Sequence, residues 1–176
     1  MVSALLGATV IINSAIFTID TFGKSPVDMA YLFIAFGVGS TAAALTVNRL
    51  KEHLSVPMII TWGVIVGLVS VIGCAAYLPN WFTLGGYCIL FGVSAAMIDT
   101  LINHIVHQVS NDHNQRALFA ANFTLTHSAW LIAYLVAGYL GSGSHVHMYF
   151  MVLTVIIAAV LLAMMVPLCM RSNKTT

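Results

Sequence analysis

Residues 122–141 read NFTLTHSAWLIAYLVAGYLG, and this stretch decides the fold class of the chain. It contains no Asp, Glu, Lys or Arg. It is also long enough to cross a bilayer, because a helix needs about 20 mostly apolar residues to span roughly 30 Å of hydrocarbon. One ionisable side chain, His127, interrupts it. The stretch therefore predicts a transmembrane helix that carries a polar group inside the span.

The rest of the chain has the same apolar character. Of its 176 residues, 60% are hydrophobic and only 6% are charged, whereas a soluble domain carries about 25% charged residues. The chain is therefore expected to be an all-α integral membrane protein in a lipid bilayer, with residues 1–176 forming one domain of six transmembrane helices. The predicted spans are about 3–20, 27–48, 56–78, 81–104, 117–141 and 147–169.

Local chemistry marks the breaks between spans. Ser25, Pro26 and Asp28 are typical of a helix start, since Ser25 can cap the helix, Pro26 suits its first turn and Asp28 can accept free N–H groups. Pro79-Asn80 separates the third and fourth spans, and GSGS at 141–144 ends the fifth.

The distribution of Lys and Arg predicts the orientation. With six spans, one side of the membrane has five of these residues and the other has only Lys24. The five are Arg49, Lys51, Arg116, Arg171 and Lys174. Cytoplasmic loops carry an excess of Lys and Arg. Both termini are therefore expected in the cytoplasm, and the expected location is a bacterial inner (plasma) membrane.

Several partner and cofactor classes receive no support from the sequence. No basic run is present, so we expect no nucleic-acid partner. The three cysteines lie in apolar stretches without CxxC spacing, which indicates neither a disulfide framework nor a zinc site. We expect no metal and no cofactor.

Small residues mark candidate helix contacts, because they allow membrane helices to approach closely. Gly39 lies among small residues of the second span, and Gly63 and Gly67 form a GxxxG pair in the third.

Polar side chains inside a membrane are costly, so they are functional candidates by default. In the fourth span, Asp99, Asn103 and His107 are spaced i, i+4, i+8 and share a face. We predict that Asp99 and Asn103 line a substrate pathway. The alternative for Asp99 is an acid near the helix end that bonds a neighbouring helix.

The first and fifth spans supply the remaining pathway candidates. Asn13 lies near the middle of the first span, and its alternative role is a hydrogen bond to a neighbouring helix. In the fifth span, His127, Trp130 and Tyr134 fall on one face. The alternative for His127 is a neutral ring bonded to a backbone carbonyl.

Residues 37–53, GVGSTAAALTVNRLKEH, resemble the loop signature of the major facilitator superfamily. That signature has glycine near a helix end, an acid-arginine pair and further basic residues. Gly39, Asn48-Arg49 and Lys51 stand at comparable positions, with Asn48 in place of the usual acid. The stretch from Arg116 to the end of the fifth span resembles the region that follows, where an Ala-Gly-x-x-Gly packing motif is carried here by Gly138 and Gly141.

The resemblance fits the C-terminal six-helix half of a twelve-helix transporter better than the first half, because the fourth span lacks the membrane arginine common there. It implies a permease: a non-enzymatic secondary transporter of a small molecule or ion that works by alternating access. Proton coupling through Asp99 or His127 is the default implication. The partner would be a second six-helix half, either covalent in a longer chain or a separate subunit.

Other classes of function stay open. The histidines favour a metal-cation transporter, with His145 and His147 at the outer mouth. A membrane subunit that serves assembly without transporting is another alternative. Intramembrane enzymes fit less well, because GSGS lacks the final glycine of a serine-protease G-x-S-G motif and His104-Ile-Val-His107 is a single histidine box.

Overall fold

The computed structural model describes residues 2–76, 80–111, 113–140 and 146–172, and over these ranges the chain forms helices and no β-strand. The prediction of an all-α protein is therefore confirmed. The first helix, Val2–Thr21, contains two π-helical turns. Its parts are α1 (Val2–Ala8), η1 (Thr9–Asn13), α2 (Ser14–Ile16) and η2 (Phe17–Thr21). Then follow α3 (Pro26–His53), α4 (Val56–Ala76), α5 (Trp81–Val109), α6 (Gln115–Leu140) and α7 (Val146–Ser172).

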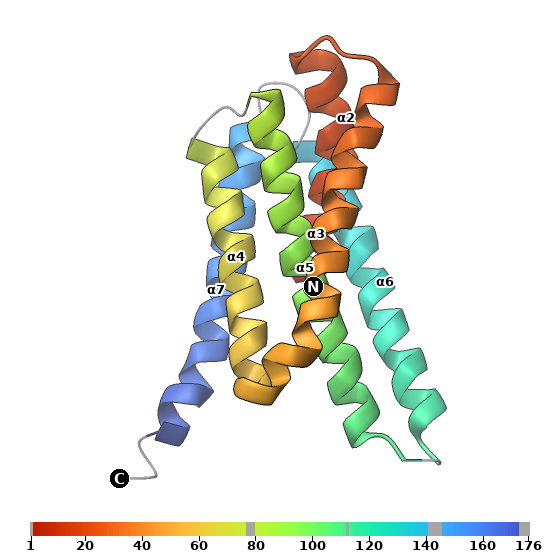
Figure 1. The fold of residues 1–176 in the computed structure, drawn as a ribbon, viewed down its shortest axis with the longest axis vertical. Helices are drawn as coiled ribbons and strands as arrows, with labels where there is room; N and C mark the ends of the chain where they lie inside the picture. The colour runs from red at the N-terminus through yellow and green to blue at the C-terminus, as the bar shows by residue number, and fades with distance from the viewer. Residues whose placement is uncertain (1, 77–79, 112, 141–145, 173–176) are drawn as a thin grey trace.

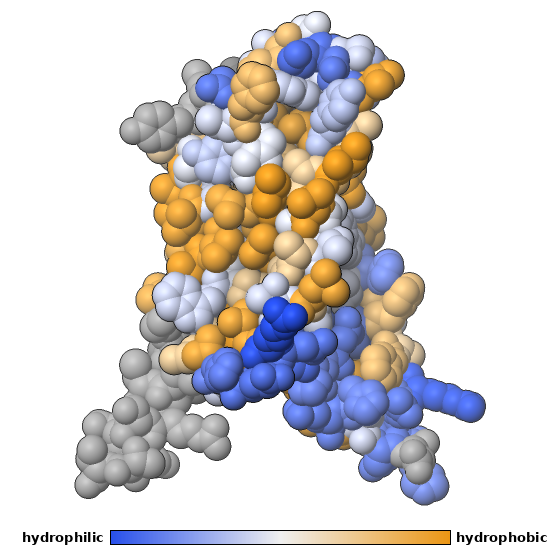
Figure 2. Space-filling view, viewed as in Figure 1, coloured by the Kyte–Doolittle hydropathy of each residue, from blue (hydrophilic) through white to orange (hydrophobic). Residues whose placement is uncertain are grey.

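The helices run side by side and alternate in direction (Figure 1). The connections from α3 to α4 and from α5 to α6 lie at the end where α7 finishes, and the connection from the first helix to α3 lies at the opposite end. Arg49, Lys51 and Arg116 belong to the first of these ends, which we call the basic end, whereas Lys24 belongs to the other. Figure 2 shows an apolar band around the middle of this face and polar side chains concentrated at the basic end.

Five of the described helices are long and apolar enough to cross a membrane: Val2–Thr21, α3, α4, α5 and α6. They fit an integral membrane protein. The sixth predicted span lies in α7, where the described apolar stretch Met148–Met164 has 17 residues. The side chains that follow in α7 lie outside the described part, so this stretch does not give the full apolar length of the helix. Spanning by α7 therefore stays a prediction.

Two helices extend further than the predicted spans. α3 continues past residue 48 to His53, and α5 continues past residue 104 to Val109. The 28 residues of α3 correspond to a length of about 42 Å at 1.5 Å per residue, which exceeds the roughly 30 Å of hydrocarbon. Hydrophobicity marks only the part of a helix in lipid, so it does not report these polar extensions.

Glycines bring α5 against two of its neighbours. A Cβ added at Gly39 of α3 would overlap the carbonyl oxygen of Ile89, so the backbones of α3 and α5 are in contact there. Gly63 and Gly67 of α4 face Ser94 of α5, whose Oγ donates to the Gly63 carbonyl oxygen at 2.7 Å. These three glycines therefore lie at close helix contacts.

The first helix lies in the interior of the bundle. All residues from Val2 to Val10 are buried. The helix packs against α6, where the Trp130 ring covers Gly7, and against α7, where the ring centroids of Phe17 and Phe150 are 6.4 Å apart. In contrast, most side chains of α6 are exposed. The buried polar side chains of the first helix, which are Ser3, Thr9, Asn13, Ser14 and Thr18, are thus held away from lipid and bulk water, whereas Asp20 and Thr21 at its end are exposed.

Candidate functional site

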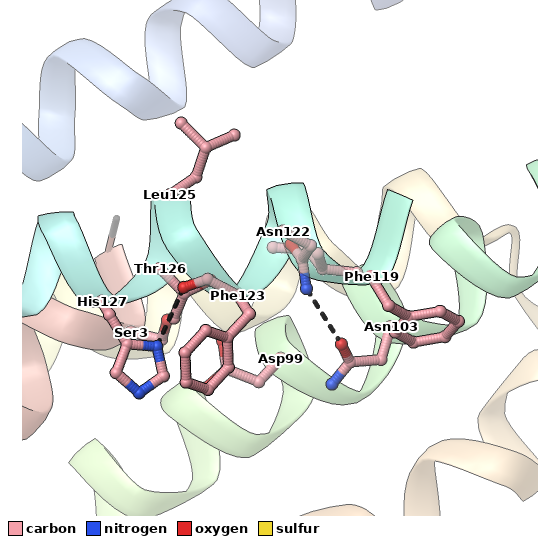
Figure 3. A pocket seen from close by; sticks show the side chains of 10 residues that line it. Ser3, Asp99, Asn103, Phe119, Asn122, Phe123, Leu125, Thr126 and His127 are labelled. Atoms are coloured by element: carbon pink, nitrogen blue, oxygen red, sulfur yellow. Dashed lines mark hydrogen bonds between the residues drawn. The ribbon is translucent and has the colours of Figure 1, made fainter. Parts of the chain in front are cut away.

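A cavity of about 480 Å³ lies between the first helix, α5 and α6. Its volume falls in the range of about 300–1,000 Å³ that is typical of small-molecule sites. The lining combines polar side chains with the rings of two phenylalanines (Figure 3). The lining residues are Ser3, Asp99, Ile102, Asn103, Phe119, Asn122, Phe123, Leu125, Thr126 and His127. The cavity can therefore offer both hydrogen bonds and apolar contact to a small solute.

Three of the predicted pathway residues meet in this cavity: Asp99 and Asn103 from α5, and His127 from α6. The half-buried carboxyl group of Asp99 lies beside the hydroxyl of Ser3. Asp99 is the one carboxylic acid among the lining residues. An ionised Asp99 therefore makes the cavity favourable for cations.

Asn103 joins the two walls of the cavity. Its Oδ1 accepts a hydrogen bond of 3.3 Å from Nδ2 of Asn122 on α6 (Figure 3). Asn122, Thr126 and Ser3 also line the cavity and are not among the residues predicted from the sequence. The i, i+4 spacing of Asn122 and Thr126 places two polar side chains on one helix face, and this signal could have found them.

The geometry around His127 fixes which ring nitrogen carries a proton. Nδ1 lies 2.9 Å from the carbonyl oxygen of Phe123, and a carbonyl oxygen can only accept, so Nδ1 is the donor. In the neutral ring, Nε2 is then unprotonated and has a lone pair available. The imidazole also stacks on the Phe123 ring, with centroids 3.7 Å apart. The ring is thus oriented so that Nε2 can accept a proton or a hydrogen bond.

The other pathway candidates lie outside this cavity. Trp130 and Tyr134 are further along α6, with ring centroids 5.4 Å apart, and Trp130 packs over Gly7 of the first helix. Asn13 lines a separate, much smaller cavity near α5 and α7. The structure therefore brings together half of the six predicted pathway residues.

The predicted loop and packing residues occupy several places. Asn48 and Arg49 are exposed near the end of α3, Lys51 is partly buried one turn further, and Arg116 is exposed at the start of α6. Gly138 is exposed, and a Cβ there would meet no atom of the described residues within 4 Å, so this glycine lies at no close contact with the described helices. Gly141 lies outside the described residues.

No protein-family model matches the chain, and no curated protein matches it either.

Proposed function

We propose that this chain is one six-helix half of a secondary active transporter of the major facilitator type. It moves a small solute across the inner membrane of a bacterium by alternating access. The observation that carries the proposal is the cavity of about 480 Å³ at Asp99, Asn103 and His127. A cavity of this size with an acid and a histidine, between membrane helices, is typical of a solute pathway.

The helix contacts support the proposal independently of the cavity. Halves of these transporters contain two three-helix repeats of inverted topology. If the six helices are counted in chain order, the first helix, α3 and α4 form one repeat and α5, α6 and α7 form the other. Exchanging the two repeats turns the contact between α3 and α5 into a contact between α6 and the first helix. The same exchange leaves the contact between α4 and α7 unchanged. In this chain α3 packs on α5, the first helix packs on α6, and α4 packs on α7. Each of these three pairs maps onto another of the three or onto itself, as such a repeat predicts, although the α4–α5 contact has no comparable counterpart between α7 and the first helix among the described residues.

The exposed side of α6 supports a second half as the partner. His127 is exposed, and so are Thr124 and Ser128 on the same helix. An ionisable side chain facing lipid is costly, so such groups face protein or a water-filled space. A second six-helix half across this face, in the same chain or as a separate subunit, supplies the protein surface and the water-filled space that these side chains need.

Asp99 and His127 are the proposed proton carriers. Both can change charge, both line the cavity, and Nε2 of His127 has a free lone pair. The substitution Asp99→Asn removes the titrating carboxyl group and keeps the volume of the side chain.

Everted membrane vesicles from cells that express the chain test this function. Sugars, amino acids, amines and organic acids are added one at a time while a dye reports internal pH. At least one class is expected to change the pH beyond control vesicles. Asp99→Asn should then lower the rate by about tenfold or more, since loss of a proton-transfer group typically costs at least that much. The matched control Tyr139→Phe, far from the cavity on α6, should leave the rate unchanged. If no class changes the pH, the assembly-subunit alternative is favoured, whereas transport that neither Asp99→Asn nor His127→Ala affects would show that these residues are not the proton carriers.

The metal-transport alternative gains no support from the described residues, where no three His, Cys, Asp or Glu side chains gather. The side chains of His145 and His147 lie outside the part that the structure describes.

A further inference from the structure

Asn13 carries a buried amide group that forms no hydrogen bond with the residues that the structure describes. The residue is 2% exposed, and neither Oδ1 nor Nδ2 has a hydrogen-bond partner among the described protein atoms. Burial of an amide without hydrogen bonds is strongly unfavourable. The side chain lines a cavity of about 10 Å³ enclosed mainly by apolar groups, which include Phe17, Phe91 and Phe150.

The nearest polar neighbours are already committed. Oγ1 of Thr9 donates its one hydrogen to the carbonyl oxygen of Leu5 at 2.7 Å. The hydroxyl of Tyr149, 2.5 Å from Thr9 Oγ1, must therefore donate to Thr9. The Ser14 hydroxyl lies beside the Cys88 thiol. What remains near Asn13 is the oxygen of Tyr149, which keeps an acceptor lone pair but has no hydrogen left to donate.

We propose that this cavity binds a single water molecule that hydrogen-bonds to both ends of the Asn13 amide. The unsatisfied amide needs an acceptor for Nδ2 and a donor for Oδ1. One water molecule can accept a hydrogen bond from Nδ2 and donate one to Oδ1. A metal cation would satisfy Oδ1 only, and no carboxylate lines the cavity to balance its charge. An anion would satisfy Nδ2 only. The volume of about 10 Å³ holds one water molecule and nothing larger.

The position of the water gives it a structural consequence. Asn13 ends the π-helical turn η1, and the cavity is bounded by the first helix, α4, α5 and α7. Single π-turns within helices occur frequently at functional sites, and ordered water is one of the ways in which irregular membrane helices satisfy their polar groups. The water thus satisfies the polar side chain that the irregular part of the first helix places in this cavity.

An experimental structure at a resolution that resolves ordered water tests the site directly. One density peak is expected within hydrogen-bond distance of both Oδ1 and Nδ2 of Asn13, and it should be absent in Asn13→Leu. A dry cavity in the wild-type protein would overturn the proposal.

Thermal unfolding in detergent supplies an independent measurement with a matched control. Thr18 lies on the same helix, is fully buried and has an unpartnered Oγ1, but it does not line the cavity. Thr18→Val should therefore raise the midpoint by at least ~2 °C, because it removes an unsatisfied group. Asn13→Leu should not raise it, because water already satisfies the amide. An equal rise in both variants contradicts bound water, and a midpoint that falls when Na⁺ is replaced by choline identifies a cation site instead.

Discussion

At the scale of single residues, glycine determines how closely α3 and α5 approach. A Cβ at Gly39 would overlap the Ile89 carbonyl oxygen, and a Cβ at Gly92 would overlap that of Phe36. The overlapped atoms belong to the backbone, so they cannot rotate away as a side chain could. Any larger residue must push the two helices apart, which would also break the 3.2 Å hydrogen bond from Ser40 Oγ to the Gly92 carbonyl oxygen.

We therefore expect Gly39→Ala to lower the free energy of unfolding by about 1–3 kcal/mol, the usual cost of overpacking. Thermal unfolding in detergent measures the effect. Gly37→Ala is the matched control on the same helix, because a Cβ there meets no atom within 4 Å. The control should be neutral or slightly stabilising, since alanine favours helix more than glycine does. Equal destabilisation by both substitutions would show that helix propensity, and not the contact with α5, determines the loss.

At the scale of helices, α3 begins where the sequence predicted a helix start, and the structure shows a capping box there. Oγ of Ser25 accepts from the Asp28 N–H at 3.4 Å, and Oδ2 of Asp28 accepts from the Ser25 N–H at 2.9 Å. The Ser25 hydroxyl also donates to Asp28 Oδ2 at 2.8 Å. Pro26 occupies the first turn, where its missing N–H costs nothing. The predicted helix start is therefore confirmed.

Ser25→Ala and Asp28→Ala should each cost about 1 kcal/mol of stability, the typical cost of losing an N-cap. The two side chains share their hydrogen bonds, so the double variant should cost less than the sum of the single variants. Asn80→Ala provides the comparison, because Asn80 caps α5 by accepting from the Thr83 N–H at 2.9 Å and shares nothing with Ser25. Its effect should add fully to that of Ser25→Ala. Full additivity of Ser25→Ala with Asp28→Ala would contradict the capping box.

The helices could be predicted from the sequence because each depends on a local run of apolar residues. The cavity could not be predicted in this way. Asp99 and His127 could be chosen as polar groups in lipid, but their convergence results from the packing of α5 and α6 around the first helix. Trp130 is predicted to lie on the same helix face as His127. Its ring, however, covers Gly7, because the first helix approaches α6 closely at this position. The π-helical turns also depend on tertiary packing, and no local sequence pattern predicts them.

At the scale of the whole molecule, the charge distribution and the helix directions agree. Arg49, Lys51 and Arg116 gather at the basic end because α3 runs toward that end and α6 begins there. Lys24 lies at the opposite end, where its Nζ sits 4.9 Å from the centroid of the Trp81 ring. Cations near the cytoplasmic surface favour retention on that side. The basic end is therefore expected to face the cytoplasm.

Site-directed labelling tests this orientation with two exposed positions, Thr21 at the end of the first helix and Gln108 at the end of α5. Three helices, α3, α4 and α5, separate the two positions, so a chain that crosses the membrane with each of them must place Thr21 and Gln108 on opposite sides. Cys74 and Cys88 are 4% and 1% exposed and should react little, and Cys169→Ser removes the third thiol.

In intact spheroplasts, a membrane-impermeant maleimide is expected to label Thr21→Cys and to label Gln108→Cys only after the membrane is permeabilised. The reverse pattern would keep the helix count between the two positions but overturn the orientation drawn from Lys and Arg. Labelling of both from the same side would mean that one of α3, α4 and α5 does not cross. The half-bundle topology would then fail together with the transport function that rests on it.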